Sequence, residues 1–175
     1  MKVLNLFGGP GTGKSTTAAG LFNKMKIQGH NVELVTEYAK DMTWEGRTNV
    51  LADQLYILAK QHRRLERLKG KVEWAVVDSP FILGLIYAPA DYYQHFEPLV
   101  MEMWDGYDNV NFMLERAFEY QTAGRMTEES AMLIDPQLEN FIDTRKIAVT
   151  RIGTDELNDD VVNEILQKCG LLPTK

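Results

Sequence analysis

Apolar and polar positions along the chain form two alternating patterns. Short, nearly continuous apolar runs predict five buried β-strands, at residues 2–7, 32–36, 72–77, 110–114 and 147–152. The segments between them carry helical spacing or helix-start signals and predict helices at about 15–28, 48–68, 81–87, 92–107, 127–143 and 154–168. This alternation predicts one α/β domain over residues 1–175, with a parallel sheet covered by helices on both faces.

A glycine-rich loop joins the first predicted strand to the first predicted helix. Its sequence is Gly8-Gly9-Pro10-Gly11-Thr12-Gly13-Lys14-Ser15-Thr16, which matches the phosphate-binding pattern G-x-x-x-x-G-K-S/T without a mismatch. Glycines allow positive φ angles and close approach to a phosphate, so successive backbone N–H groups can point at one anion. We expect Lys14 to bind the β and γ phosphates of a nucleotide and the Ser15 hydroxyl to bind Mg²⁺.

Composition and charge narrow the classes of partner. The chain has 175 residues, 45% of them hydrophobic and 25% charged, which is typical of a globular protein. Its net charge of −6 disfavours nucleic-acid binding by the whole chain, although basic residues gather at 62–71. No apolar run reaches the roughly 20 residues of a membrane helix, and the N-terminus does not resemble a signal peptide. The missing membrane helix predicts no membrane partner. Since Cys169 is the only cysteine, we expect no internal disulfide and a cytoplasmic location.

Carboxylates follow two of the predicted strands, at the sheet edge where parallel α/β folds bind their ligands. Asp78 ends the third strand, where it could hold Mg²⁺, take a proton from an acceptor hydroxyl or cap the next helix. Glu37 ends the second strand and is either a contact of the phosphoryl acceptor or an ordinary surface charge. Asp41 is a weaker third candidate. The sequence leaves open which carboxylate is the base.

Two missing signatures make ATP the expected phosphoryl donor. Asp78 is followed by Ser79 and Pro80, whereas many motor ATPases place a Glu there to polarise a water molecule. A guanine-specifying N-K-x-D sequence is also missing, since the nearest match, at 23–26, lacks the Asp and lies inside a predicted helix. These absences disfavour ATP hydrolysis for mechanical work and disfavour GTP, leaving ATP with Mg²⁺.

Two arginines follow the fourth predicted strand, in a segment that we interpret as a lid at about 116–126. Phosphoryl transfer needs positive charge around the moving group and exclusion of water. Arg116 and Arg125 would supply both on closure, with Gly124 as the hinge. Each arginine alone is as readily explained as a surface residue. Their joint position favours the lid.

The predicted helix at 48–68 carries candidates for recognition of the acceptor. Gln54 and Gln61 are two turns apart and therefore share a face. A Gln amide that points into a pocket can make paired hydrogen bonds to a nucleobase edge, and Tyr38 is one of several aromatic residues that could stack on the base. A solvated Gln and a core aromatic are equally good interpretations of each residue taken singly.

The phosphate loop, Asp78 and the arginine-containing segment together resemble the P-loop nucleoside and nucleotide kinase superfamily over about residues 2–168. More narrowly, the segments 36–41, 53–61, 78–80 and 124–129 resemble small kinase-like proteins of tailed bacteriophages. The resemblance implies a three-layer αβα P-loop NTPase fold with strand order 2-3-1-4-5 and a small lid. It also implies that Glu37 lies near the acceptor and that Gln54 or Gln61 reads the base.

The chain departs from deoxynucleoside kinases at 78–80, where Asp-Ser-Pro stands in place of their Glu-Arg-Ser. The missing Arg leaves the acceptor open. Some of the phage relatives are thought to phosphorylate hydroxymethylated pyrimidines already in DNA, so the resemblance also admits a polymer as acceptor.

The preferred function is a kinase that moves the ATP γ-phosphoryl group to a nucleoside, nucleotide or modified base. Lys14 and the loop would hold ATP, Ser15 and Asp78 would hold Mg²⁺, and Glu37 or Asp78 would orient the acceptor. The alternatives are a nucleotide-switched ATPase that acts through a protein partner, and a kinase acting on modified DNA. The oligomeric state stays open, with a homodimer among the alternatives.

Overall fold

The computed structural model describes residues 1–115, 128–153 and 159–172, and its centre is a five-stranded parallel sheet. The strands are β1 (Lys2–Phe7), β2 (Val32–Val35), β3 (Trp74–Val77), β4 (Asp108–Glu115) and β5 (Thr150–Gly153). Their order is β2-β3-β1-β4-β5, and every neighbouring pair is parallel. The predicted fold class and strand order are therefore confirmed.

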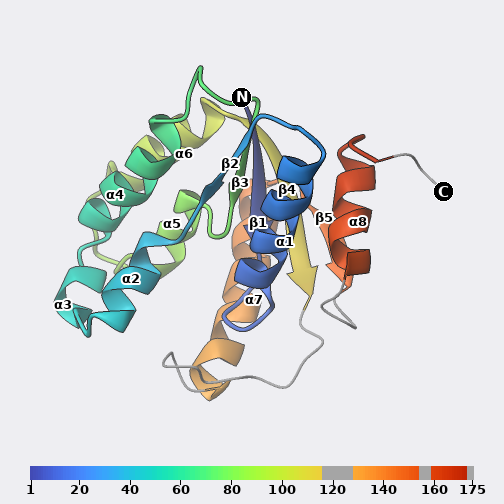
Figure 1. Ribbon diagram of the computed structural model, residues 1–175. Coiled ribbons are helices and arrows are strands. Elements are labelled where there is room, and N and C mark those ends of the chain that lie inside the picture. Colours follow the sequence, from blue (N-terminus) through green and yellow to red (C-terminus); the bar gives the residue numbers. More distant parts are fainter. Residues whose placement is uncertain (116–127, 154–158, 173–175) are drawn as a thin grey trace.

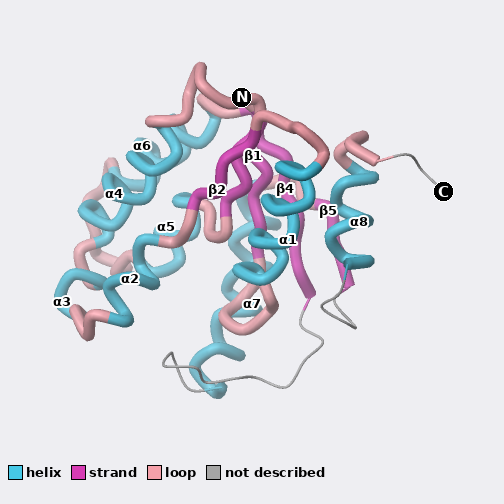
Figure 2. Tube along the Cα trace, in the orientation of Figure 1, coloured by secondary structure: helices cyan, strands magenta, loops and turns pink. Residues whose placement is uncertain are grey.

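Helices cover both faces of the sheet, so the fold has three layers (Figures 1 and 2). Helices α1 (Lys14–Ile27) and α8 (Asp159–Lys168) lie on one face, while α4 (Gln54–Glu66), α6 (Phe96–Asp105) and α7 (Glu128–Arg145) lie on the other. Shorter elements complete the described chain: α2 (Tyr38–Trp44), α3 (Thr48–Leu51), the 3₁₀ helix η1 (Phe81–Leu83) and α5 (Gly84–Tyr87). Within the described ranges, no helix is both long and apolar enough to cross a membrane.

The central strand β1 is buried on both sides, which explains its nearly continuous apolar sequence. Leu4 and Leu6 pack into the core beneath α1 and α8. Val3 and Phe7 point to the opposite face and pack into the core formed with α4, α6 and α7. β1 thus anchors both layers, and the loop that follows it leaves the middle of the sheet between β3 and β4.

The prediction of a single helix at 48–68 is wrong, because the structure has two helices there, α3 and α4. The chain breaks between α3 and α4, and the Asp53 carboxylate accepts a hydrogen bond from the Tyr56 backbone N–H at 3.1 Å. That contact caps a new helix. The leucine spacing at Leu51, Leu55 and Leu58 runs through the break, so periodicity alone did not reveal it.

Other elements also differ from the prediction: β5 begins at Thr150 rather than at residue 147, and the helix predicted at 81–87 is the 3₁₀ helix η1 followed by α5. Helix α2 was not predicted, because Met42 is its only buried residue and no apolar stripe marks it. Helix α6 begins at Phe96 rather than near residue 92, after a turn in which the Phe96 N–H donates to the Tyr93 carbonyl at 2.9 Å. The lid at 116–126 and the predicted first residues of the helices at 127–143 and 154–168 lie outside the described residues.

A ladder of asparagines joins β1 to β4 inside the sheet. The Asn5 side chain is 1% exposed, and its Nδ2 donates to Oδ1 of Asn109 and to Oδ1 of Asn111, each at 3.0 Å. Asn109 in turn donates to the Trp104 carbonyl at 2.8 Å, and Asn111 donates to the Ala148 carbonyl at 3.0 Å. These side chains link the end of α6 and the approach to β5 to the central strand.

We predict that Asn5→Ala lowers the free energy of unfolding by about 1–3 kcal/mol, because two amide oxygens lose their buried donor. Chemical denaturation followed by circular dichroism measures the change. Asn23→Ala, on an exposed position of α1, is the matched control and should stay within about 0.5 kcal/mol of wild type. An Asn5→Ala variant as stable as the control would show that the ladder contributes nothing.

Candidate active site

The loop between β1 and α1 has the backbone that its glycines predict. Gly8, Gly11 and Gly13 have φ angles of 147°, 81° and 86°, a region that residues with a Cβ rarely adopt. The N-cap of α1 is Gly13, and no side chain caps the helix there. The N–H groups of the first turn therefore face the loop. Exposed N–H groups at a helix N-terminus form a binding site for an anion such as phosphate.

Gly8 has no room for a side chain. A Cβ at this position would lie 2.5 Å from Thr12 Oγ1 and 3.0 Å from the Leu114 carbonyl oxygen of β4. Thr12 is itself buried, and its hydroxyl donates to the Gly9 carbonyl at 3.0 Å. The loop is therefore closed on itself and packed against the end of β4.

The two side chains predicted to bind phosphate and metal lie at the start of α1. Lys14 Nζ donates to the carbonyl oxygens of Gly8 and Gly9, each at 2.8 Å, which holds the ammonium group over the loop. The Ser15 hydroxyl accepts a hydrogen bond from Lys40 Nζ at 3.0 Å. Lys40 belongs to the unpredicted helix α2 and was not among the predicted site residues.

A small cavity of about 270 Å³ brings Ser15 and Asp78 together with Glu37 and Lys40. Asp78 is 4% exposed, and its Oδ1 has no hydrogen-bond partner in the part of the chain that the structure describes. Burying a carboxylate oxygen without a partner is costly unless a cation binds there. Hydroxyl and carboxylate oxygens are ligands that Mg²⁺ accepts. Ser15 and Asp78 therefore fit the predicted Mg²⁺ site.

The part of the chain that the structure describes has no cluster of side chains that could enclose a metal ion. Among the described residues, no group of three or more His, Cys, Asp or Glu side chains is arranged to hold a metal ion. Mg²⁺ usually binds through one or two carboxylates and completes its shell with phosphates and water.

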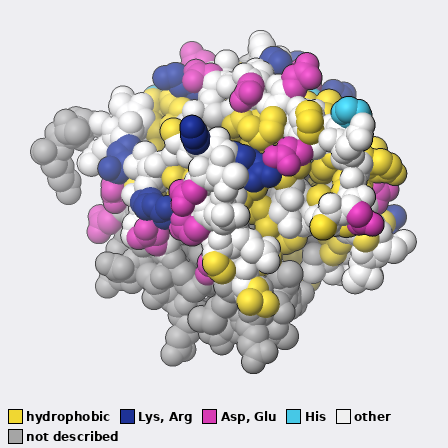
Figure 3. Space-filling model, turned by 180° about the vertical axis from the view of Figure 1, so that it is seen from behind, with side chains coloured by type: hydrophobic (Ala, Val, Ile, Leu, Met, Phe, Trp, Pro, Cys, Tyr) yellow, Lys and Arg dark blue, Asp and Glu magenta, His cyan; other side chains and the backbone are white. Residues whose placement is uncertain are grey.

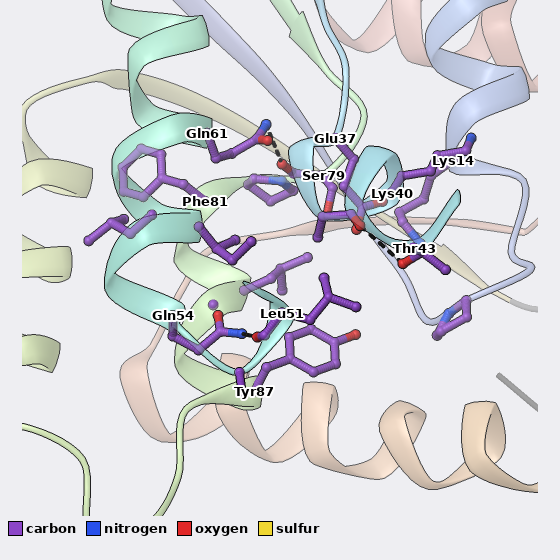
Figure 4. A pocket seen from close by; sticks show the side chains of 18 of the residues that line it. Lys14, Glu37, Lys40, Thr43, Leu51, Gln54, Gln61, Ser79, Phe81 and Tyr87 are labelled. Atoms are coloured by element: carbon purple, nitrogen blue, oxygen red, sulfur yellow. Dashed lines mark hydrogen bonds between the residues drawn. The ribbon is translucent and has the colours of Figure 1, made fainter. Parts of the chain in front are cut away.

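A larger cavity of about 480 Å³ opens beside the phosphate loop. Lys14 and Lys40 lie at one end of it, Gln54, Leu51 and Tyr87 lie at the other, and Glu37 lies between the two ends (Figure 4). The rest of its wall is mostly apolar and includes Trp44, Ala52, Ile57, Leu58, Pro80, Phe81 and Leu83. A cavity of this size with few polar groups is typical of a small-molecule binding site.

The comparisons with known proteins agree with this geometry. A family model described as an AAA domain matches residues 3–159, which is most of the chain. The chain belongs to this AAA domain family. A comparison with curated proteins finds no sequence match.

Solved structures share the fold of this AAA-domain chain. The deoxyadenosine kinase from M. mycoides with bound dATP aligns with a TM-score of 0.63 and 18% identity, covering 97% of this chain and 100% of that chain. The thymidylate kinase from Ehrlichia chaffeensis aligns with a TM-score of 0.62 and 16% identity, covering 97% and 98%. These similarities confirm the predicted nucleoside and nucleotide kinase-like fold. The bacteriophage resemblance stays a prediction.

Gln54 and Tyr87 are the polar groups at the far end of the large cavity. Gln54 is 6% exposed, and its Nε2 donates to the Leu51 carbonyl at 2.7 Å. Its Oε1 would lie 3.2 Å from a Cβ added to Gly84, so the glycine makes room for the amide. The Tyr87 side chain is 46% exposed overall. Partial desolvation of its hydroxyl in the cavity, together with the nearby carboxylates of Glu37 and Asp135, raises the pKa of Tyr87 to about 12. Like an ordinary tyrosine, Tyr87 is protonated at neutral pH and can donate a hydrogen bond.

Gln61 lines the same cavity, but backbone groups engage its amide. Its Oε1 accepts from the Tyr38 N–H at 2.7 Å, and its Nε2 donates to the carbonyl oxygens of Thr36 and Ser79 at 3.2 and 3.3 Å. These contacts hold the ends of β2 and β3 in place. This arrangement favours a positioning role for Gln61 and leaves Gln54 as the better candidate for reading a base.

Tyr38 is not among the residues that line either cavity. Its ring lies under the guanidinium of Arg64 at 5.2 Å, and its hydroxyl donates to the Tyr56 hydroxyl at 3.3 Å. The structure thus places Tyr38 outside the site that it was predicted to join. Arg116 and Arg125 lie outside the described residues.

Gly8→Ala should lower the affinity for nucleotide by about tenfold to a hundredfold, because the strained loop costs about 1–3 kcal/mol. Titration calorimetry with a non-hydrolysable ATP analogue measures the loss. Gly153→Ala is the matched control, since a Cβ there meets nothing within 4 Å and φ is not positive. Equal affinity of Gly8→Ala and wild type would contradict the assignment of the loop as the phosphate site.

Proposed function

We propose that this AAA-domain protein transfers the γ-phosphoryl group of ATP to a hydroxyl of a nucleoside, a nucleotide or a modified nucleobase. The observation that carries the proposal is the large cavity, which begins at the phosphate loop and extends past a carboxylate to an amide and a phenol. Hydrolysis of ATP needs only a water molecule beside the γ phosphate. A cavity of about 480 Å³ in that position is more readily explained by an organic acceptor.

The donor side follows from the chemistry of the phosphate loop. The loop N–H groups and the start of α1 would bind the phosphates, and Lys14 would move from its carbonyl partners to the β and γ phosphates. Ser15 and Asp78 would hold Mg²⁺, which supplies positive charge to the phosphate oxygens as charge shifts during transfer. Arg116 and Arg125 would neutralise the same negative charge on the phosphoryl group as it moves.

The two cavities divide the carboxylates between two roles. Asp78 lines only the small cavity with Ser15, which supports a role as metal ligand. Glu37 lines both cavities and lies between the phosphate end and the base end of the larger one. We therefore assign Glu37 to the acceptor hydroxyl, which it would orient and from which it would accept the proton.

The far end of the large cavity supports an acceptor with a base-like ring. Gln54 offers an amide and Tyr87 an O–H donor within an apolar wall, a combination that suits a flat ring with polar edges. The names of the structural neighbours, deoxyadenosine kinase and thymidylate kinase, point to the same class of acceptor.

A modified pyrimidine within DNA is a narrower version of this acceptor, but surface charge gives it little support. Basic and acidic side chains are interspersed on the face shown in Figure 3, and that face carries no continuous basic stripe among its described residues. Within the basic segment at 62–71, Arg64 pairs with Asp41, and Lys69 pairs with Glu66 at 3.6 Å. A free nucleoside or nucleotide is therefore the favoured acceptor.

The test is ADP release from Mg·ATP against a panel of acceptors, with Lys14→Ala as the blank. The panel contains nucleosides, nucleoside monophosphates, nicotinamide riboside, and DNA with and without hydroxymethylated pyrimidines. We expect one small acceptor to raise turnover by orders of magnitude. A slow rate that no acceptor changes would overturn the kinase and favour the nucleotide-switched ATPase, and stimulation by modified DNA with a steep salt dependence would identify the polymer acceptor.

Glu37→Gln should lower kcat for phosphoryl transfer by about a hundredfold or more, while the affinity for ATP changes little. The substitution keeps the shape of the side chain, and Glu37 makes no side-chain cap hydrogen bond to α2. Glu45→Gln, an exposed position at the end of the same helix, is the matched control and should retain wild-type kcat. If both variants turn over normally, Glu37 has no part in the transfer.

A further inference from the structure

Helix α2 carries a lysine between the two cavities of the candidate active site. Glu37, Lys40 and Trp44 recur at i, i+3 and i+7 from the N-cap of this helix, so they share one face. All three residues line both the large and the small cavity. Lys40 therefore belongs to the walls of both the acceptor cavity, which is shown in Figure 4, and the small cavity that contains the predicted Mg²⁺ site.

The ammonium group of Lys40 already binds a group that the metal would need. Lys40 Nζ donates to Ser15 Oγ at 3.0 Å. The same hydroxyl would bind Mg²⁺ at about 2.0–2.1 Å. The ammonium and the metal would then be adjacent cations on one oxygen atom, and their repulsion in a partly buried cavity opposes simultaneous binding.

The surroundings of α2 allow the Lys40 side chain to move while the helix stays in place. The Gln61 amide accepts from the Tyr38 N–H, and the Arg64 guanidinium forms an ion pair with Asp41, so α4 holds two successive parts of α2. These contacts lie on residues other than Lys40. A lysine has a long flexible stem and can swing its charge by several ångströms without backbone movement.

We propose that Lys40 is a built-in substitute for the metal cation. It holds the Ser15 hydroxyl before nucleotide binds and moves to the phosphates when Mg·ATP arrives. The inference rests on the ATP and Mg²⁺ part of the proposed function and is independent of the acceptor. Before nucleotide binds, the ammonium places positive charge in the cavity that contains the buried Asp78 carboxylate. After the exchange, Lys40 is a positioning residue that adds a second lysine, beside Lys14, to the phosphate end of the large cavity.

Two opposite effects of removing Lys40 follow from this arrangement. Without Mg²⁺, nucleotide binding should weaken by about 3-fold to 10-fold, because the phosphates lose one charge-assisted hydrogen bond. With Mg²⁺, the metal should act at lower concentration, because the ammonium group that repels it at Ser15 and at the phosphates is gone. A lysine that only supports the fold would produce neither effect on a correctly folded variant.

The experiment is calorimetric titration of AMP-PNP, a non-hydrolysable ATP analogue, into wild type and Lys40→Met at a series of free Mg²⁺ concentrations that begins in EDTA. Lys40→Arg keeps the positive charge, and Lys26→Met removes the same charge from α1, where Lys26 lies over the Phe22 ring at 5.5 Å. We expect Lys40→Met to bind more weakly in EDTA and to reach half of its Mg²⁺-dependent gain at about tenfold lower Mg²⁺. Lys26→Met should follow wild type, and Lys40→Arg should lie closer to wild type than Lys40→Met.

The outcomes separate this inference from the proposed function. If wild type binds the analogue in a Mg²⁺-dependent way and Lys40→Met has the same Mg²⁺ dependence, Lys40 is not a substitute for the metal cation and the proposed function stands. If wild type shows no Mg²⁺-dependent binding, both are overturned. Thermal unfolding of each variant, followed by circular dichroism, confirms that the comparison is made between folded proteins.

Discussion

The packing of Gly8 against Thr12 and the end of β4 is the constraint on which the site depends. A side chain at Gly8 would overlap Thr12 Oγ1 at 2.5 Å, so the chain can leave the central strand only with a glycine there. The positive φ of Gly13 then starts α1 so that its first N–H groups face the loop. Because β1 lies between β3 and β4, this anion site stands in the middle of the sheet edge. Asp78 and Glu37 reach the same edge from the ends of β3 and β2.

The sequence predicted the features that local chemistry determines. The glycine and lysine pattern of residues 8–16 identified the phosphate loop, and apolar runs identified the strands because strands buried on both faces need continuous apolar residues. The break between α3 and α4 was missed because the leucine spacing continues through it, whereas the deciding event is the cap made by Asp53. Helix α2 was missed because it buries a single residue.

The roles of side chains whose partners lie far away in the chain could not be predicted from the sequence. Nothing near Gln61 in the chain indicates that its amide would bind backbone groups of Thr36, Tyr38 and Ser79. Lys40 meets Ser15 across 25 positions of the chain, so its place in the site appears only once β1, β2 and their helices are assembled. The spacing of Lys40 three residues after Glu37 was the one local signal, and it becomes useful only after α2 is known to be a helix.

The central claim is that the γ-phosphoryl group goes to an organic hydroxyl, since the cavity beside the phosphate loop is large enough for an acceptor and carries Glu37 at its middle. The most direct measurement uses ATP labelled in the γ-phosphoryl group, with the label followed by mass spectrometry in the presence of the acceptors. The account predicts that the label appears in a phosphate ester of a nucleoside- or nucleotide-like acceptor. Recovery of all the label as inorganic phosphate would contradict it.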